Sequence, residues 1–329
     1  MWTIPRPVTV LIMAAAIGVT LTAPHAAAQA GSGLAGPLRI VDLGTLGGGF
    51  SQARAINERG EIVGVSSTGS ASHAFLWRNG RMTDLGTLGG SFSAAFDINN
   101  RSEVVGYSAT RDDALHAFIW RNGRMTDLGT LAGGTSIATA VNDRGDVVGD
   151  DDGPNGLHAF MWRHGTMTDL GTLTGDWSRA YGINNHGAVV GESTVDAMTT
   201  AAVLWRHGPI TRLGEDQSGP ATAINDRGQV TGFDTDASSA YLWDSGRFTR
   251  IDKPDGSTSI QAMGLNNRAA VVGFTDLGAF LWQRGQLTTL PSLAGGITSA
   301  LDINDQGQIV GLSATTPDEF NLHAVLWTR

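Results

Sequence analysis

Residues 53–86 read ARAINERGEIVGVSSTGSASHAFLWRNGRMTDLG, and the pattern of this segment recurs along the rest of the chain. An asparagine follows an apolar residue, with an alanine four residues before it, a glycine seven residues after it and a tryptophan further on. The equivalent asparagines are Asn57, Asn99, Asn142, Asn184, Asn225, Asn266 and Asn304, at intervals of 42, 43, 42, 41, 41 and 38 residues. Periods of this length are typical of repeat architectures. We number the repeats one to seven after these asparagines.

Each repeat contains short segments rich in β-branched and aromatic residues, which favour strands. The segments of repeat one are residues 53–57, 61–65, 73–78 and 81–85. Asn79-Gly80, between the last two, supplies the positive φ angles of a two-residue hairpin. Four strands in about 42 residues match one blade of a β-propeller. We therefore predict an all-β fold, a seven-bladed β-propeller with four-stranded blades over residues 38–329.

The seventh repeat has no fourth strand of its own, because the sequence ends at Arg329, directly after the third strand. Residues 39–44, RIVDLG, match the fourth-strand segment RMTDLG at residues 81–86, although no first three strands precede them. We predict that this N-terminal strand pairs in the last blade and closes the ring. An open β-solenoid, which would need a cap at each end, is the alternative.

The N-terminus has the features of a secretory signal peptide over residues 1–30. Arg6 precedes an apolar run, and the segment ends in Ala28-Gln29-Ala30. The apolar run is shorter than the about 20 residues that cross a bilayer as a helix. We expect cleavage after Ala30, a short linker over residues 31–37, and a secreted protein, extracellular or periplasmic, with no membrane span after signal removal.

The composition excludes several kinds of site and partner. The chain has no cysteine, so disulfides, thiolate zinc sites and a cysteine nucleophile are excluded. Loss of Arg6 with the signal peptide changes the formal net charge from −9 to −10, and the sequence shows no basic cluster. Nucleic acid is therefore not an expected partner. We expect a monomer without a cofactor.

The third-strand phrases carry a family resemblance. Residues 73–77 read HAFLW, and residues 116–120 and 158–162 repeat the phrase as HAFIW and HAFMW, each followed by Asp-Leu-Gly-Thr-Leu. These motifs resemble the HAF-repeat family, whose members are described as extracellular repeat proteins. The resemblance covers residues 38–329 and implies export and repetition, but it brings no catalytic motif. Repeats four to six depart from the pattern, since Ala201, Ser239 and Gly278 replace the histidine.

Histidine and aspartate occur together in four repeats. The pairs are His73 with Asp84, His116 with Asp127, His158 with Asp169 and, if the ring closes, His323 with Asp42. In the hairpin register set by the Asn-Gly turn, His73 lies diagonal to Asp84 on one sheet face, within side-chain reach. We expect structural hydrogen bonds in these pairs, because buried polar groups need partners. Metal binding or acid–base chemistry is the alternative.

Function is expected at one mouth of the ring. In a propeller, the loops after the second and fourth strands emerge together, and loops often carry function. We assign the repeated tryptophans to packing between blades, whereas Trp177 belongs to no repeat position. The candidate ligand-binding residues, which break the repeat near this mouth, are Arg54, Asp97, Trp177, Arg179, Tyr181 and Asp302. Neutral variation on a solvated rim is the alternative.

One acidic segment suggests a cation site. Asp150, Asp151 and Asp152 precede Gly-Pro-Asn-Gly, and we interpret the segment as a turn-rich loop of the kind that hard cations favour. Its spacing does not match an EF-hand. Calcium is therefore a possible ligand here, with a solvated acidic turn as the alternative.

Three functions are compatible with these patterns. The first is a binding module for an extracellular polymer, peptide or protein. The second is a propeller hydrolase or lyase, in which Asp97 and Asp302 form an acidic pair and Arg54 stabilises negative charge. The third is a structural protein of the cell envelope or matrix. We predict the binding module.

Overall fold

The computed structural model describes residues 38–329 except 154–155, 197–198, 207–208, 216–217 and 318–320. The predicted signal peptide and linker lie outside the described residues. All the regular elements of the described chain are β-strands. A membrane-crossing helix, judged by length and apolar character, is not found in this described part.

The strands follow the repeats. Repeats one and two contain β2 (Ser51–Ile56), β3 (Ile62–Ser67), β4 (Ser72–Arg78), β5 (Arg81–Asp84), β6 (Gly89–Ile98), β7 (Val104–Thr110), β8 (Leu115–Arg121) and β9 (Arg124–Asp127). Repeats three and four contain β10 (Thr135–Val141), β11 (Val147–Gly153), β12 (Gly156–Arg163), β13 (Thr166–Asp169), β14 (Ser178–Ile183), β15 (Val189–Thr194), β16 (Thr200–Trp205) and β17 (Thr211–Arg212). Repeats five and six contain β18 (Ala221–Ile224), β19 (Val230–Phe233), β20 (Ser239–Asp244), β21 (Arg247–Asp252), β22 (Ile260–Leu265), β23 (Val271–Thr275), β24 (Gly278–Gln283) and β25 (Gln286–Thr289). Repeat seven contains β26 (Thr298–Ile303), β27 (Ile309–Ala314) and β28 (Leu322–Thr328).

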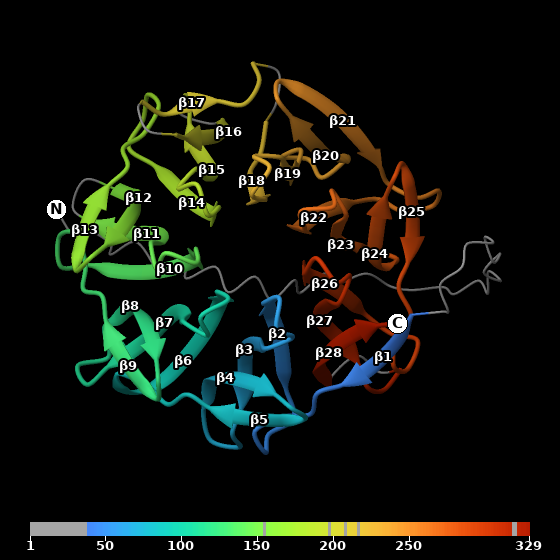
Figure 1. Ribbon diagram of the computed structural model, residues 1–329, viewed down its shortest axis with the longest axis horizontal. Coiled ribbons are helices and arrows are strands. Elements are labelled where there is room, and N and C mark those ends of the chain that lie inside the picture. The colour runs from blue at the N-terminus through green and yellow to red at the C-terminus, as the bar shows by residue number, and fades with distance from the viewer. Residues whose placement is uncertain (1–37, 154–155, 197–198, 207–208, 216–217, 318–320) are drawn as a thin grey trace, which may run out of the picture. The chain divides into compact units, whose positions relative to one another are not determined.

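Consecutive strands of a repeat pair antiparallel, so the predicted four-stranded sheets are confirmed. The sheets of repeats one and two are joined by one parallel pairing between Ser72 and Phe92, and together count as a single eight-stranded sheet. Figure 1 shows that the first strand of a repeat lies nearest the centre and the fourth lies at the periphery. The first strands therefore position the central side chains.

The N-terminal strand β1 (Arg39–Asp42) completes the sheet of repeat seven. It pairs antiparallel with β28, with Arg39 opposite Thr328 and Asp42 opposite Val325. The resulting strand order is β1-β28-β27-β26. Apolar side chains of repeats one and seven share one core cluster, in which Phe75 is fully buried with Val310.

The periodic glycine is explained by a bulge in the first strand. In repeat three the register shifts between Ala138 and Ala140, so Thr139 has no partner in the ladder. Gly149 pairs with Ala138, and a Cβ atom on Gly149 would lie 1.9 Å from the carbonyl oxygen of Ile137. Only glycine fits this close approach. The bulged residue of each repeat, three before the asparagine, is thereby released from the ladder.

Candidate functional site

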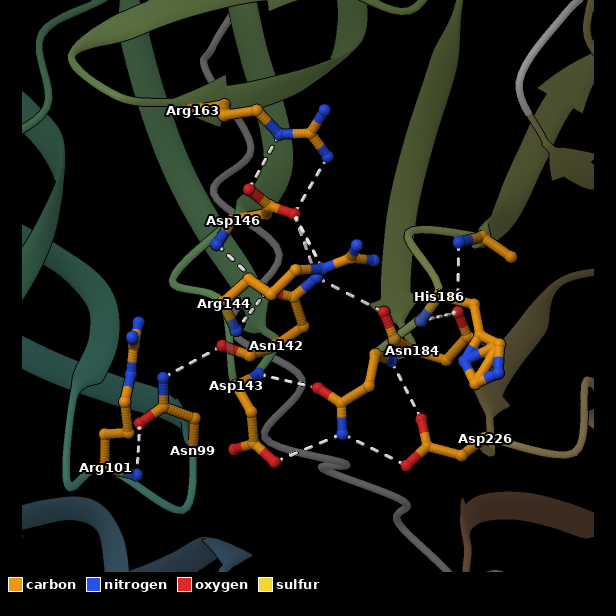
Figure 2. Close-up of polar contacts among 12 residues, drawn as sticks. Asn99, Arg101, Asn142, Asp143, Arg144, Asp146, Arg163, Asn184, His186 and Asp226 are labelled. Carbon is orange, nitrogen blue, oxygen red and sulfur yellow. Dashed lines mark hydrogen bonds and ion pairs between the residues drawn. The ribbon is translucent and has the colours of Figure 1, made fainter.

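The asparagine that defines each repeat follows the innermost strand and organises the turn behind it. Asn142 Oδ1 accepts hydrogen bonds from the backbone N–H groups of Arg144 and Asp146, both at 3.0 Å. Its Nδ2 donates to the backbone carbonyl of Asn184 in the next repeat, at 3.3 Å. Figure 2 shows these contacts. One side chain therefore closes its own turn and joins two repeats.

This inter-repeat bond is made by the asparagine of every repeat. The donor–acceptor distances lie between 2.9 and 3.3 Å. Asn304 Nδ2 donates to the backbone carbonyl of Asn57 at 3.1 Å, which connects repeat seven to repeat one. We call these seven side chains the asparagine ring. The regular spacing of the asparagines predicts that their positions are equivalent, but it does not predict the hydrogen bond between repeats.

The residue after each asparagine forms a second set of inter-repeat bonds. These residues are Glu58, Asn100, Asp143, Asn185, Asp226, Asn267 and Asp305. Each backbone N–H donates to a side-chain oxygen of the next repeat, as in Asp143 N–H to Asn185 Oδ1 at 2.7 Å (Figure 2). Acids and amides alternate around this set. Because the number of repeats is odd, the alternation breaks where two acids, Glu58 and Asp305, lie next to each other. Burial raises the pKa of Glu58, and the negative charge of Asp305 raises it further.

All the residues of these two sets except Asn304 line a central cavity of about 190 Å³, together with apolar residues such as Ile98 and Ile183. The described residues that line it do not include Arg54, Asp97 or Asp302. The asparagine ring joins adjacent repeats through its Nδ2 atoms and the second set does so through its side-chain oxygens, which assigns both sets to holding adjacent repeats together.

Asp97 and Asp302, the predicted acidic pair, also link neighbouring repeats. Asp97 accepts the backbone N–H of Ile98 at 2.7 Å and that of Val141, in the next repeat, at 2.8 Å. Asp302 likewise accepts the backbone N–H of Ile303 at 2.8 Å and that of Ile56, in repeat one, at 2.9 Å. Burial raises the pKa of Asp97 to about 7 and that of Asp302 to about 6, although the N–H groups oppose the rise. Both carboxylates therefore hold backbone groups of two repeats.

Arg54 occupies the bulge position of β2. Its guanidinium carbon lies 4.3 Å from the ring centroid of Phe96, the equivalent residue of repeat two. Its Nε is buried without a hydrogen-bond partner, and across the described residues no ion pair to it is found. Burial lowers the pKa of Arg54 to about 10, so the side chain stays cationic at neutral pH. The ring of Tyr107 is tilted against that of Phe96, with 5.6 Å between the ring centroids, which extends the aromatic surface.

Three other candidates lie together in repeat four. The Arg179 guanidinium carbon is 5.6 Å from the ring of Trp177, and its Nε is 3.6 Å from Asp150 Oδ1. The Tyr181 hydroxyl donates to Glu192. Burial raises the pKa of Asp150 to about 6 and also raises that of Glu192, while the charge of Arg179 opposes both shifts. We call these five side chains the repeat-four cluster.

The acidic segment at residues 150–152 is a strand, and the prediction of a turn-rich loop was wrong. These residues extend β11, which pairs with β10 and β12, because the Val-Val-Gly strand continues through the acids. Side chains alternate along a strand. Asp150 contacts Arg179, whereas Asp151 Oδ2 accepts the N–H of Leu131 at 3.0 Å and Asp152 is exposed. In the part of the chain that is described, no three histidine or acidic side chains are close enough to hold a metal ion.

The structure brings together the members of each predicted histidine–aspartate pair. His73 Nδ1 lies 2.8 Å from Asp84, and the distance is 2.8 Å for His116 and Asp127, 2.7 Å for His158 and Asp169, and 2.9 Å for His323 and Asp42. Phe75 lies opposite Asp84, the register that the Asn-Gly turn predicts. The other oxygen of Asp84 accepts the N–H of Gly86 at 2.7 Å. The aspartate therefore anchors both the histidine and the turn after the strand.

Sequence reasoning missed Glu192 and Tyr107, and it assigned Asp150 to a different kind of site. All three stand eight residues after the repeat asparagine, where the other repeats have Val65, Phe233, Phe274 and Leu312. Polar or ionisable groups in an otherwise apolar column were the signal that could have identified them. Tyr107 and Glu192 contact the bulge residues Phe96 and Tyr181, whereas Asp150 contacts Arg179.

Comparison with known proteins bears on the fold. No protein-family model matches the chain, and no curated protein matches it. Similar solved structures include virginiamycin B lyase from Staphylococcus aureus, with a TM-score of 0.61 at 12% identity over 89% of this chain and 99% of that chain. The β-propeller domain of the Trilobed protease from Pyrococcus furiosus gives 0.57 at 10% identity, covering 84% and 93%. YCF48 bound to D1 peptide gives 0.55 at 12% identity, covering 89% and 95%. The chain therefore has a β-propeller fold.

Proposed function

We propose that this protein is a secreted binding module whose extracellular ligand contacts the bulge residues at the centre of the propeller. The observation that carries the proposal is Arg54, a half-buried cation that lies on an aromatic ring, with its Nε buried and with no acidic partner among the described residues. A buried charge without a partner costs free energy, so its retention favours a role in binding an anionic group.

We also propose that the propeller has seven blades and is closed by its N-terminal strand. The pairing of β1 with β28 and the bond from Asn304 to Asn57 support this arrangement. Export remains inferred from the signal-peptide features of residues 1–30. Membership of the HAF-repeat family is proposed on the His-Ala-Phe phrases.

The ligand that these side chains favour carries an anionic group and a flat or apolar portion. Arg54 supplies charge, and Phe96 and Tyr107 supply an aromatic surface beside it. The repeat-four cluster adds half-buried polar groups, and among the described residues its buried Arg179 Nε atom has no hydrogen-bond partner. Pockets that combine aromatic surface with a few oriented polar groups are typical of ligand sites. An extracellular peptide or glycan with carboxylate groups has these properties.

The hydrolase or lyase alternative requires Asp97 and Asp302 to act on a substrate. The pKa of Asp97, raised to about 7, suits a general acid. However, each carboxylate binds two backbone N–H groups from different repeats. Catalysis would have to break these structural bonds, so the geometry favours binding.

A binding screen tests the proposal. Residues 31–329 would be applied to arrays of peptides and glycans, and hits would be measured by calorimetry with Arg54→Gln, Arg179→Ala and Trp177→Ala. We expect the Arg54 and Arg179 changes to weaken binding about tenfold or more, as for loss of a charge-assisted contact. Arg212→Gln, an exposed arginine of β17, is the matched control and should bind normally. Unchanged binding in the Arg54 and Arg179 variants, with unchanged melting temperatures, would discard this site.

A further inference from the structure

The basic residues gather on one side of the propeller although they are scattered in sequence. The turns between first and second strands and between third and fourth strands lie on the same side, because each repeat is an antiparallel meander. We call this side the turn face. Six basic residues of the described chain lie elsewhere, away from these turns and from the strand ends beside them. They are Arg54, Arg111, Arg179, Arg212, Arg250 and Lys253. All other lysines and arginines after residue 37 are on the turn face.

Repeats one to three share an arrangement that leaves their arginines exposed. Each has an arginine two residues after the repeat asparagine, an acid two residues further on, and an arginine at the end of the third strand. The arginines are Arg59, Arg78, Arg101, Arg121, Arg144 and Arg163. In each repeat the two arginines lie within 4 Å of the same acid.

The acids of this arrangement are covered by the arginines. In repeat three the side chain of Asp146 is 5% exposed, whereas that of Arg144 is 54% exposed and that of Arg163 is 45% exposed. Arg163 binds Asp146 through two hydrogen bonds of 2.7 and 2.8 Å, as Figure 2 shows. These bonds lower the pKa of Asp146, so the acid stays ionised and fixes the arginines in place. The surface that solvent meets is therefore predominantly cationic.

A groove between repeats two and three concentrates this charge. It has a volume of about 250 Å³, and its lining includes three arginines, Arg101, Arg121 and Arg144, the acids Glu103 and Asp146 that pair with them, and Trp162. A Cβ atom on Gly145 would lie 2.7 Å from Arg101 Nη2 and 2.8 Å from Arg121 Nη2, so the two guanidiniums converge over this glycine. Arg121 Nε is 2.8 Å from the acid of repeat two, which orients the guanidinium toward the groove.

We propose that the turn face of repeats one to three binds an acidic polysaccharide, with its carboxylate or sulfate groups at the arginines and a sugar ring in the groove beside Trp162. Guanidinium pairs recognise such anions bidentately. A chain can follow the arc of arginines and avoid the acids at the centre of this face, Glu58 and Asp143 among them. A flat anionic membrane would have to cover those acids, which disfavours it as the ligand. The expected secretion disfavours nucleic acid as the ligand.

Titrations with defined polymers test this proposal on residues 31–329. The probes are polygalacturonate, dextran sulfate, neutral dextran, vesicles of phosphatidylglycerol with phosphatidylcholine, and single-stranded DNA. The test variant combines Arg101→Gln, Arg121→Gln and Arg144→Gln. The control combines Arg111→Gln, Arg212→Gln and Arg250→Gln, which removes the same number of positive charges at positions that do not lie on the turn face. A second test variant, Arg81→Gln with Arg124→Gln, removes exposed arginines of β5 and β9 that form no ion pair within the described chain.

We expect an acidic polysaccharide to bind with an affinity that falls as salt rises, and neutral dextran not to bind. Both test variants should weaken this binding about tenfold or more, while the control binds as the wild type does. Thermal unfolding of each variant separates loss of binding from loss of folding, and the second variant provides the test if the first is unstable. The proposal is overturned if neither polyanion binds, if the control loses as much affinity as the test variants, or if only vesicles or DNA bind.

Discussion

Asn142 satisfies three backbone groups with a single side chain. Two of these groups belong to its own turn and the third belongs to the next repeat. Because the residue is buried, its removal leaves two N–H groups and one carbonyl without these partners. This explains why an asparagine recurs at the position in all seven repeats, where a shorter or apolar side chain could not make the contacts.

Asn142→Ala is therefore expected to lower the free energy of unfolding by about 2–4 kcal/mol, since each lost partner costs about 1 kcal/mol or more. Urea unfolding of the purified variant measures the loss. Asn100→Ala, at an exposed position of the neighbouring set, should cost less than half as much. Equal losses in the two variants would contradict the structural role assigned to the asparagine ring.

The half-buried carboxylate of Asp97 predicts a pH dependence of stability. Its pKa is raised from 3.8 to about 7 in the folded protein, so the folded state binds more protons than the unfolded state between these values. This carboxylate should therefore make the free energy of unfolding fall as pH rises from about 4 to about 7. Asp97→Asn should remove that contribution, which comparison of urea unfolding at several pH values measures. A variant whose pH profile runs parallel to that of the wild type would refute it.

At the scale of the element, the hairpin of the third and fourth strands was predictable because its determinants are local. The Asn-Gly turn sets the register, and the register places His73 beside Asp84. The acidic end of β11 was not predictable in the same way. Asp150 is stabilised by Arg179, a residue of the next repeat, and this tertiary contact allows a buried acid in a strand that composition alone suggests is a loop.

Asp84 should contribute more than His73 to the stability of this hairpin. Asp84→Ala removes both the bond to His73 and the bond from the N–H of Gly86, whereas His73→Ala removes only the first. Both side chains are partly exposed, so we expect losses of about 1 kcal/mol for Asp84→Ala and less than about 0.5 kcal/mol for His73→Ala. Thermal and urea unfolding of the two variants measure this order, and the reverse order would exclude the proposed anchoring.

At the scale of the whole molecule, the repeat pattern predicted the sheets and the pairing of residues 39–42 with the last strand. It did not predict the turn face, because arginines about 42 residues apart look scattered in a sequence and meet only when the repeats stand side by side. The central cation was identified at Arg54, but its isolation depends on which acids lie nearby, which a single sequence does not give. The two proposed sites therefore differ in origin, because Arg54 departs from the repeat whereas the arginines of the turn face recur in repeats one to three.

Ring closure is the central claim, since it places every site described above. Arg39 and Thr328 lie opposite each other in β1 and β28, and the chain has no cysteine of its own. The double variant Arg39→Cys with Thr328→Cys should form an intramolecular disulfide under mild oxidation, while the mismatched pair Arg39→Cys with Gln283→Cys should not. A cross-link that encloses nearly the whole described chain should stabilise it by several kcal/mol, up to about 5, and raise the melting temperature. Mass spectrometry of the oxidised monomer is the decisive measurement: a quantitative internal disulfide is predicted, and free thiols or only intermolecular dimers would contradict the closed ring.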